Sequence, residues 1–260
     1  LVASAAHGGW AATGCGRGGG MPSAAGYPAR VDAQRDPALS RWLWLVKWLL
    51  TIPHQIILVF LWLAFLVLSS IAFVAILITA RYPRPIFDFN LGVLRWTWRV
   101  AYYSYGALGT DRYPPFTLAE VPDYPAHLRL PYPQRLSRGL VLVKWWLLAL
   151  PHYLVLGFFL GGGGLLATQR GEVVITSSVG LLGLLVLFAA VTLLFTGRYP
   201  DGIYDLVLGI NRWALRVAAY AGLMTDSYPP FRLAQGGTDP ATPNVAADVD
   251  GHSVSQTRPG

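Results

Sequence analysis

Long apolar runs dominate the chain, and short polar segments separate them. Residues 42–80 are almost wholly apolar, whereas the apolar runs 139–160 and 179–197 are divided by the sequence GGGGLLATQRGEVVITSS. At about 1.5 Å per residue, the first run is nearly twice as long as a ~30 Å hydrocarbon layer requires. It is therefore either two tightly joined spans or an interfacial helix followed by one long span.

The interruption of the later apolar material indicates where the first run divides. It falls about ten residues after Pro151–His152, and the same offset in the first run falls near Trp62. The segment Leu61–Phe65 nevertheless contains no Gly, Pro or Asn to make a turn. On this comparison we expect membrane spans at 41–61, 63–80, 139–160 and 179–197.

A different periodicity follows each pair of spans. Residues 86–108 and 203–223 place polar side chains at i, i+4, i+7 and i+11, opposite Trp, Leu and Phe. A basic polar face opposite large apolar side chains is typical of a helix that lies in the membrane interface. The two polar stripes are Asp88, Gly92, Arg95 and Arg99, and Asp205, Gly209, Arg212 and Arg216.

The second half of the chain restates the first. RYPRPIFDFNLGVLRW returns as RYPDGIYDLVLGINRW, and LVKWLLTIPH returns as LVKWWLLALPH. This self-similarity indicates a duplicated unit of roughly a hundred residues. We expect an all-α membrane protein of two tandem repeats, each a transmembrane helical hairpin followed by an amphipathic interfacial helix. The expected segments are a disordered 1–26, repeats at 27–128 and 129–233, and a disordered tail at 234–260.

Composition and charge support a membrane location. Apolar residues make up 54% of the chain and charged residues 13%, about half the share of a soluble domain. The net charge is +7, and because the arginines flank apolar runs, the expected partner is anionic lipid and not nucleic acid. With four spans, nearly all 20 Lys and Arg lie on one side of the membrane, and only Arg170 lies on the opposite side. The positive-inside rule then places both termini in the cytoplasm.

Two lysines and two histidines recur near the starts of the apolar runs. Lys47 and Lys144 stand beside tryptophans, which suggests either snorkelling to the headgroups or a direct lipid contact. His54 and His152 each follow a proline that frees a backbone carbonyl, so each imidazole is either a cap for a kink or part of a pathway between the repeats.

The remaining candidates are the arginines of the polar stripes. Arg95, Arg99, Arg212 and Arg216 form either exposed intrahelical ion pairs or sites for anionic headgroups, since guanidinium binds phosphate with fork geometry. No cofactor motif or catalytic signature is present, and two histidines are too few for a typical zinc site. The single cysteine, Cys15, excludes an intramolecular disulfide. We therefore expect no metal, no cofactor and no catalytic residues.

Several of these phrases together resemble a known family. IPH (52–54), RYP (81–83), IFDF (86–89) and TDRYPPF (110–116), with their counterparts in the second half, are similar to the bacterial membrane family called domain of unknown function 4389. The similarity covers residues 27–233, apart from the insert at 161–179. It implies an integral protein of the bacterial inner membrane, and it brings no activity and no catalytic residues.

Three functions are compatible with this pattern. The favoured one is a non-enzymatic accessory or scaffold unit that contacts anionic lipid. A small transporter or channel with a pathway between the repeats is the second, and it would use the histidines. A lipid-modifying membrane enzyme is the third, and it would need three or more polar residues clustered at one depth.

Overall fold

The first apolar run folds as one uninterrupted helix. In the computed structural model, which describes residues 27–161, 165–169, 172–176 and 180–233, helix α1 extends over Trp44–Thr79 and passes through Pro53. The turn that we expected near Trp62 is not formed, so 41–61 and 63–80 are not two spans. The physical reason was visible in the sequence: Leu61–Phe65 contains no helix-breaking residue, and every neighbour is a good helix former or a large apolar side chain.

The later apolar runs form helices near the expected residues. Helix α3 (Arg138–Val143), the π-helix η1 (Lys144–Leu148) and helix α4 (Leu150–Leu160) follow one another without a break, and helix α5 covers Leu181–Thr196. The end of α4 meets the start of α5: a Cβ added to Gly180 would lie 2.2 Å from the backbone nitrogen of Gly161. The residues between these glycines are therefore an insertion whose two ends touch.

The π-helix absorbs one additional residue. Lys47 and His54 are seven positions apart in the first half of the chain, whereas Lys144 and His152 are eight apart in the second. A π-turn accommodates a single inserted residue inside an α-helix. The wider turn at Lys144–Leu148 therefore keeps the second lysine and the second histidine on the same side of their helix.

Two further helices return alongside the apolar ones. Helix α2 covers Arg84–Tyr103 and helix α6 covers Asp201–Ala221, each beginning directly after a Tyr-Pro pair. These prolines, Pro83 and Pro200, are the N-cap residues, with extended backbone, and a proline suits the start of a helix because it has no N–H to satisfy. Most side chains of both helices are buried, including Trp98, Tyr102 and Tyr220, so these helices carry the core.

The chain is mostly, but not entirely, helical. Strand β1 (Arg30–Ala33) pairs antiparallel with β2 (Ala126–Arg129), with Val31 opposite Leu128. Strands β3 (Leu165–Gln169) and β4 (Glu172–Thr176) form a second antiparallel pair within the insertion. The helical repeat analysis did not predict β1 and β2, because four-residue strands are too short to show a clear alternation.

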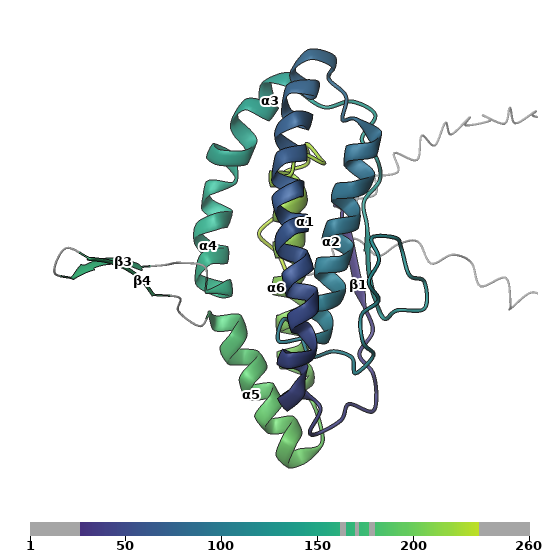
Figure 1. The fold of residues 1–260 in the computed structure, drawn as a ribbon, viewed down its shortest axis with the longest axis vertical. Helices are drawn as coiled ribbons and strands as arrows, with labels where there is room; N and C mark the ends of the chain where they lie inside the picture. Colours follow the sequence, from purple (N-terminus) through teal and green to yellow (C-terminus); the bar gives the residue numbers. More distant parts are fainter. Residues whose placement is uncertain (1–26, 162–164, 170–171, 177–179, 234–260) are drawn as a thin grey trace, which may run out of the picture. The chain divides into compact units, whose positions relative to one another are not determined.

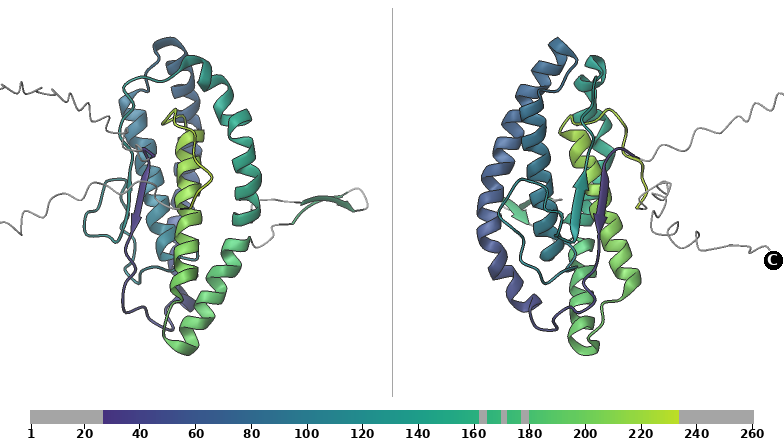
Figure 2. Two further views of the ribbon diagram at one scale, coloured as in Figure 1. Left: turned by 180° about the vertical axis from the view of Figure 1, so that it is seen from behind. Right: turned by 90° about the vertical axis from the view of Figure 1, so that its right-hand side faces the viewer.

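The helices and the first sheet form three layers (Figures 1 and 2). The outer layer holds α1 and, antiparallel to it, the run from α3 to α5. The middle layer holds α2 and α6, and the sheet β1–β2 covers their other side. Contacts at both ends of the outer layer show that α1 and the α3–α5 run are antiparallel. At one end, the N–H of Leu136, before α3, donates to the carbonyl of Ala80 after α1 (3.0 Å). At the other end, Arg41, before α1, lies against Gly197 after α5.

Some expectations fall on residues that the structure does not describe. These are the disorder of 1–26 and 234–260, and the position of Arg170 across the membrane.

Candidate functional site

The two lysines are buried in ion pairs within the protein. Nζ of Lys47 lies 2.8 Å from Oδ1 of Asp111 and donates to the carbonyl of Thr110 (2.7 Å). Nζ of Lys144 lies 2.8 Å from Oδ1 of Asp226 and donates to the carbonyl of Thr225 (3.1 Å). The lysine side chains are 2% and 0% exposed. Each ammonium therefore joins its apolar helix to a Thr-Asp dipeptide, which follows α2 in the first half and α6 in the second.

The same aspartates also fix the start of each apolar run. The second carboxylate oxygen of Asp111 accepts from the backbone N–H of Ser40, and that of Asp226 accepts from Ser137 (2.6 Å). Sequence analysis missed both aspartates as partners. The available signal was their recurrence in Thr-Asp-x-Tyr-Pro-Pro-Phe, which occurs once in each half of the chain.

The histidines lie in aromatic clusters, one in each half. The ring of His54 stacks on Phe116 with centroids 4.0 Å apart, and Nδ1 accepts a hydrogen bond from Nε1 of Trp96 (3.1 Å). The ring of His152 stacks on Phe231 at 4.2 Å and meets Trp213 edge-on at 5.5 Å. Both histidines are fully buried. The Pro-Pro-Phe segments thus provide the stacking partners.

No carbonyl bond of the kind expected for a kink cap is formed by His54. Its Nε2 has no hydrogen-bond partner within the part of the chain that the structure describes, and the same holds for both ring nitrogens of His152. Each histidine contacts aromatic residues of its own half, so the structure does not bring the two together across the halves. Their roles as pathway or capping residues stay predictions.

The arginines of the polar stripes bind backbone carbonyls. Arg95 donates to Leu128 in β2 (3.1 Å) and Arg212 donates to Val31 in β1 (3.0 Å), so each strand is held by one guanidinium. Arg95 also forms an ion pair with Glu120 (2.8 Å). The two polar stripes therefore face the sheet, and these arginines hold it against α2 and α6.

The second arginine of each stripe holds the segment after Pro-Pro-Phe. Arg99 donates to the carbonyls of Thr117 and of Ala119 (2.9 Å), and Arg216 donates to that of Arg232 (3.3 Å). Burial lowers the pKa of Arg99 and that of Arg216 below the usual value, although guanidinium remains charged at any ordinary pH. These two arginines are 2% and 1% exposed.

The glycine of each stripe allows this segment to approach closely. A Cβ on Gly92 would lie 2.7 Å from Cβ of Leu118, and a Cβ on Gly209 would lie 2.6 Å from that of Leu233. Every residue of the two polar stripes except the exposed aspartates thus contacts another part of the protein. Contact of Arg95, Arg99, Arg212, Arg216, Lys47 and Lys144 with lipid headgroups stays a prediction.

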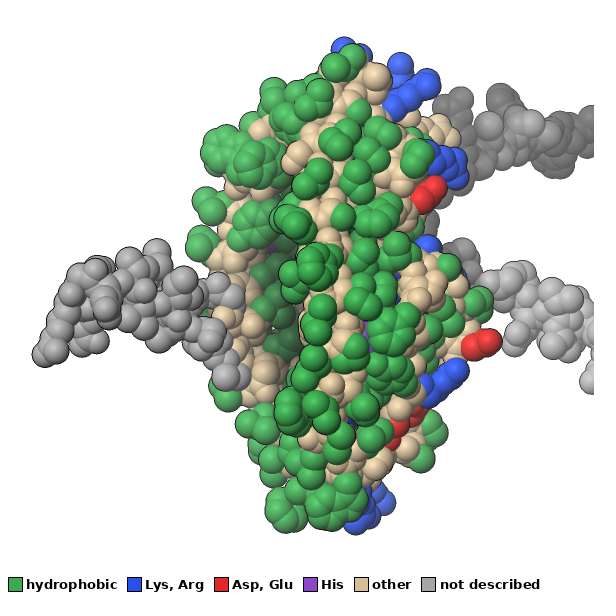
Figure 3. Space-filling view, viewed as in Figure 1, with side chains coloured by type: hydrophobic (Ala, Val, Ile, Leu, Met, Phe, Trp, Pro, Cys, Tyr) green, Lys and Arg blue, Asp and Glu red, His purple; other side chains and the backbone are tan. Residues whose placement is uncertain are grey.

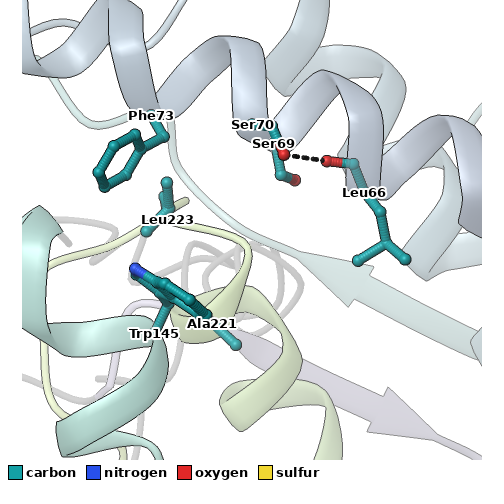
Figure 4. A pocket seen from close by; sticks show the side chains of 7 residues that line it. All are labelled: Leu66, Ser69, Ser70, Phe73, Trp145, Ala221 and Leu223. Atoms are coloured by element: carbon teal, nitrogen blue, oxygen red, sulfur yellow. Dashed lines mark hydrogen bonds between the residues drawn. The ribbon is translucent and has the colours of Figure 1, made fainter.

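An apolar groove separates α1 from the α3–α5 run. One part, of about 310 Å³, lies between Ser69, Ser70 and Phe73 of α1 and Trp145 of η1 (Figure 4). Another part, of about 490 Å³, reaches Trp62 of α1, Thr97 of α2, and residues of α4 and α6. Neither histidine lines these parts of the groove. The few polar groups in them are hydroxyls and amides, which suit an apolar occupant better than an ion.

The described residues hold no group of three or more His, Cys, Asp or Glu side chains that could bind a metal ion. The buried polar side chains instead join parts of the fold. Tyr102 and Tyr204 share a hydroxyl–hydroxyl bond of 2.7 Å between the halves, and Asn90 donates to the hydroxyl of Tyr82 (2.9 Å). Burial, together with the bond to Tyr204, raises the pKa of Tyr102.

The chain matches a protein-family model. The model of the domain of unknown function DUF4389 matches residues 41–117 and 173–232, together just over half of the chain. No curated protein and no solved structure matches. Two helical segments, Trp44–Thr79 and Arg138–Leu160, are long and apolar enough to cross a membrane.

Proposed function

Because the chain belongs to the DUF4389 family, whose function is unknown, we propose from its own geometry that it is a non-enzymatic membrane accessory protein that binds anionic lipid. The observation that carries this proposal is the outer layer, where large apolar side chains are exposed along α1, α4 and α5 (Figure 3). A monomeric soluble protein rarely exposes so large a contiguous apolar surface. Hydrocarbon is the environment in which this surface is stable.

The fixed roles of the recurring residues favour a scaffold over an enzyme. Lys47 and Lys144 are occupied by aspartates, and Arg99 and Arg216 by backbone carbonyls. We therefore assign the headgroup contacts to arginines that are exposed at the two ends of the outer layer. These are Arg81, Arg84, Arg135 and Arg138 at one end, and Arg41 and Arg198 at the other.

Exposed tryptophans support the same assignment. Trp42 and Trp48 lie at the start of α1, and Trp145 and Trp146 lie in η1, all about half exposed or more. Tryptophan is enriched at the level of lipid headgroups because its ring is apolar and its N–H is polar.

Vesicle flotation tests this function. The full chain should float with mixed phosphatidylcholine–phosphatidylglycerol vesicles, and less strongly with phosphatidylcholine alone. Replacing Arg81 and Arg84 by Gln should weaken partitioning to the anionic vesicles about 30-fold, because each surface arginine contributes about 1 kcal/mol. The matched control replaces Arg30 and Arg129 by Gln. Both are exposed on the sheet β1–β2, away from the outer layer, so partitioning should be unchanged. A chain that floats with neither vesicle would disprove the proposal.

A transporter is the second candidate, and the groove is the observation that favours it. In a transporter the groove would open to both aqueous sides and flux would depend on its hydroxyls, such as Ser69 and Thr97. Loss of flux in reconstituted vesicles on replacing these residues by Val would support that role.

A further inference from the structure

The exposed apolar surface of the outer layer extends over its whole length. On α1 it begins at Leu45 and Val46, includes Phe60, which is 67% exposed, and continues to Ile78, which is 69% exposed. The buried side of the same helix is a narrow stripe that contains Lys47, His54, Leu58, Phe65, Ala72 and Ile76. Apolar side chains are therefore exposed from one end of α1 to the other.

This length does not suit a helix that crosses a bilayer. The 36 residues of α1 extend over about 54 Å, against a hydrocarbon layer of about 30 Å. To bury both ends in hydrocarbon, α1 would have to tilt by more than about 50°, whereas spanning helices tilt by about 0–40°. An upright α1, with its axis close to the membrane normal, would instead leave Leu45 or Ile78 outside the hydrocarbon layer.

The sheet excludes an upright position on separate grounds. Nε1 of Trp62, at the middle of α1, bonds to Thr97 of α2 (3.1 Å), and two residues earlier Arg95 binds the carbonyl of Leu128 in β2. The strand is thus level with the middle of α1, on the other side of α2. Arg30, Asp32 and Arg129 are exposed on this sheet. In an upright molecule, a two-stranded sheet with charged side chains would lie at the bilayer centre, where open sheet edges do not occur.

The direction of the helices gives a third argument. Since α1 and the α3–α5 run are antiparallel, Arg81 and Arg84 lie at one end of the layer and Arg198 lies at the other. An upright molecule would place these basic groups in opposite aqueous compartments, against the positive-inside rule. A molecule lying flat places all of them on one side, beside the headgroups of one leaflet.

We propose that the outer layer lies flat in a single leaflet, with α1 and the α3–α5 run parallel to the membrane plane, and that the described helices do not cross the bilayer. The partner surface is one anionic leaflet: its acyl chains contact α1, α4 and α5, and its phosphates contact the arginines at the two ends. The sheet and the loops around it face the water on the same side. This inference rests on the proposed membrane function and specifies its orientation.

Depth measurements with nitroxide labels test the orientation. In the full chain with Cys15→Ser, single substitutions Leu45→Cys, Phe60→Cys and Ile78→Cys place labels at the two ends and near the middle of α1. All three positions are exposed, so the labels should not disturb the fold, and circular dichroism verifies this. Accessibility to oxygen and to a water-soluble nickel chelate gives the depth in mixed phosphatidylcholine–phosphatidylglycerol vesicles. Arg129→Cys, on the sheet, is the matched control.

A flat outer layer predicts one shallow depth for all three labels, about 5–10 Å below the headgroups, with the label at position 129 open to the nickel chelate. A deep label at Phe60, with Leu45 and Ile78 near opposite surfaces, would overturn the flat orientation and leave membrane binding intact. Failure of the labelled chain to bind vesicles would overturn the membrane function itself. A protected label at position 129 would also contradict the proposal, because it would place the sheet inside the bilayer.

Discussion

Lys47 and Lys144 are the only lysines in the chain, and both are buried against aspartates. Removing one partner of a buried ion pair leaves the other charge without compensation, which typically costs about 3–5 kcal/mol. We expect Lys47→Met to lower the free energy of unfolding by about 3 kcal/mol in a denaturant titration. Adding Asp111→Asn should restore most of this loss, because no charge is then left unpaired and the amide oxygen can still accept from the N–H of Ser40.

Two controls accompany this prediction. Arg138→Gln, which removes an exposed positive charge at the start of α3, should change the stability by less than about 0.5 kcal/mol. An amine-specific reagent should modify neither lysine in the folded chain and both after denaturation. Rapid labelling of the native chain would show that the lysines are not held as described.

Tyr220 gives the fold a dependence on alkaline pH. Burial, and after it the negative charge of Asp226, raises the pKa of Tyr220 to about 12, against about 10 in an unfolded chain. The neutral phenol is therefore favoured by folding. This contribution is complete below pH 10 and is lost as the pH rises toward 12, by roughly 2–3 kcal/mol in total.

The variant Tyr220→Phe isolates this effect. Its unfolding free energy should fall less steeply than that of the parent chain between pH 10 and pH 12, and the two slopes should agree at neutral pH. Equal slopes for the parent chain and Tyr220→Phe would contradict the prediction.

Sequence reasoning selected the residues better than it assigned their partners. The recurrence of Lys47, His54, Arg95 and Arg99 in both halves marked them as important. Their partners are not local: Asp111 is 64 positions after Lys47, and helical periodicity relates only residues within a few turns. Compositional rules for lysine and arginine near apolar runs therefore pointed to lipid, whereas the structure shows protein partners for these side chains.

At the scale of the elements, the π-helix η1 allows a sharp test. Comparing LVKWLLTIPH with LVKWWLLALPH identifies Trp146 as the additional residue. Deleting Trp146 should convert the π-turn to an α-turn, keep Lys144 and His152 in place, and change the stability by no more than about 1 kcal/mol. Deleting Leu49 from α1 is the control. It should rotate Lys47 by about 100° relative to His54 and break the ion pair with Asp111.

Denaturant unfolding and amine labelling read out both deletions. The chain without Leu49 should be destabilised by several kcal/mol, in line with a broken buried pair, and Lys47 should become reactive. Equal losses for the two deletions would show that η1 does not compensate for an additional residue.

The extent of α1 illustrates how a local signal and a comparison can conflict. The absence of a helix-breaking residue from Leu61–Phe65 indicated a single helix, and the structure has a single helix there. The gap in the second half suggested a turn, because an insertion and a loop between two spans have the same appearance in a sequence. The contact of Gly161 with Gly180, together with the common direction of α4 and α5 in Figure 1, shows that the gap interrupts a helical run without reversing its direction.

At the scale of the whole molecule, the two halves share one core. The hydroxyl of Tyr82 donates to Gly222 (3.2 Å) and that of Tyr199 donates to Ala107 (3.0 Å), in addition to the Tyr102–Tyr204 bond. Strand β1 belongs to the first half, yet it is held by Arg212 of the second.

We expect the halves not to fold separately. Residues 27–128 expressed alone should lack a cooperative unfolding transition in detergent, because α2 would lose its packing against α6. The full chain should unfold in one transition by both circular dichroism and tryptophan fluorescence. Two separate transitions in the full chain would contradict this expectation.

The apolar runs were sufficient to predict a helical chain with membrane-length segments, but not its layers. Periodicity shows which side of a helix is apolar and not what covers the other side. The strands that cover α2 and α6 are too short to be recognised, so the polar stripes were assigned to the membrane interface. With the sheet in place, the stripes face inward, and the surface that we propose to face the membrane is the outer layer.

The junction of Gly161 and Gly180 has a consequence for how such a chain can vary. His152 and Arg198 are 46 positions apart and His54 and Arg81 are 27 apart, and the 18 residues between Gly161 and Gly180 account for all but one of the difference. Because its ends meet within one helical line, sequence can be gained or lost there without moving Lys144, His152 or the arginines that hold the sheet. Related chains should differ most in length at this point, whereas the spacing from Arg198 to Phe231 should be constant.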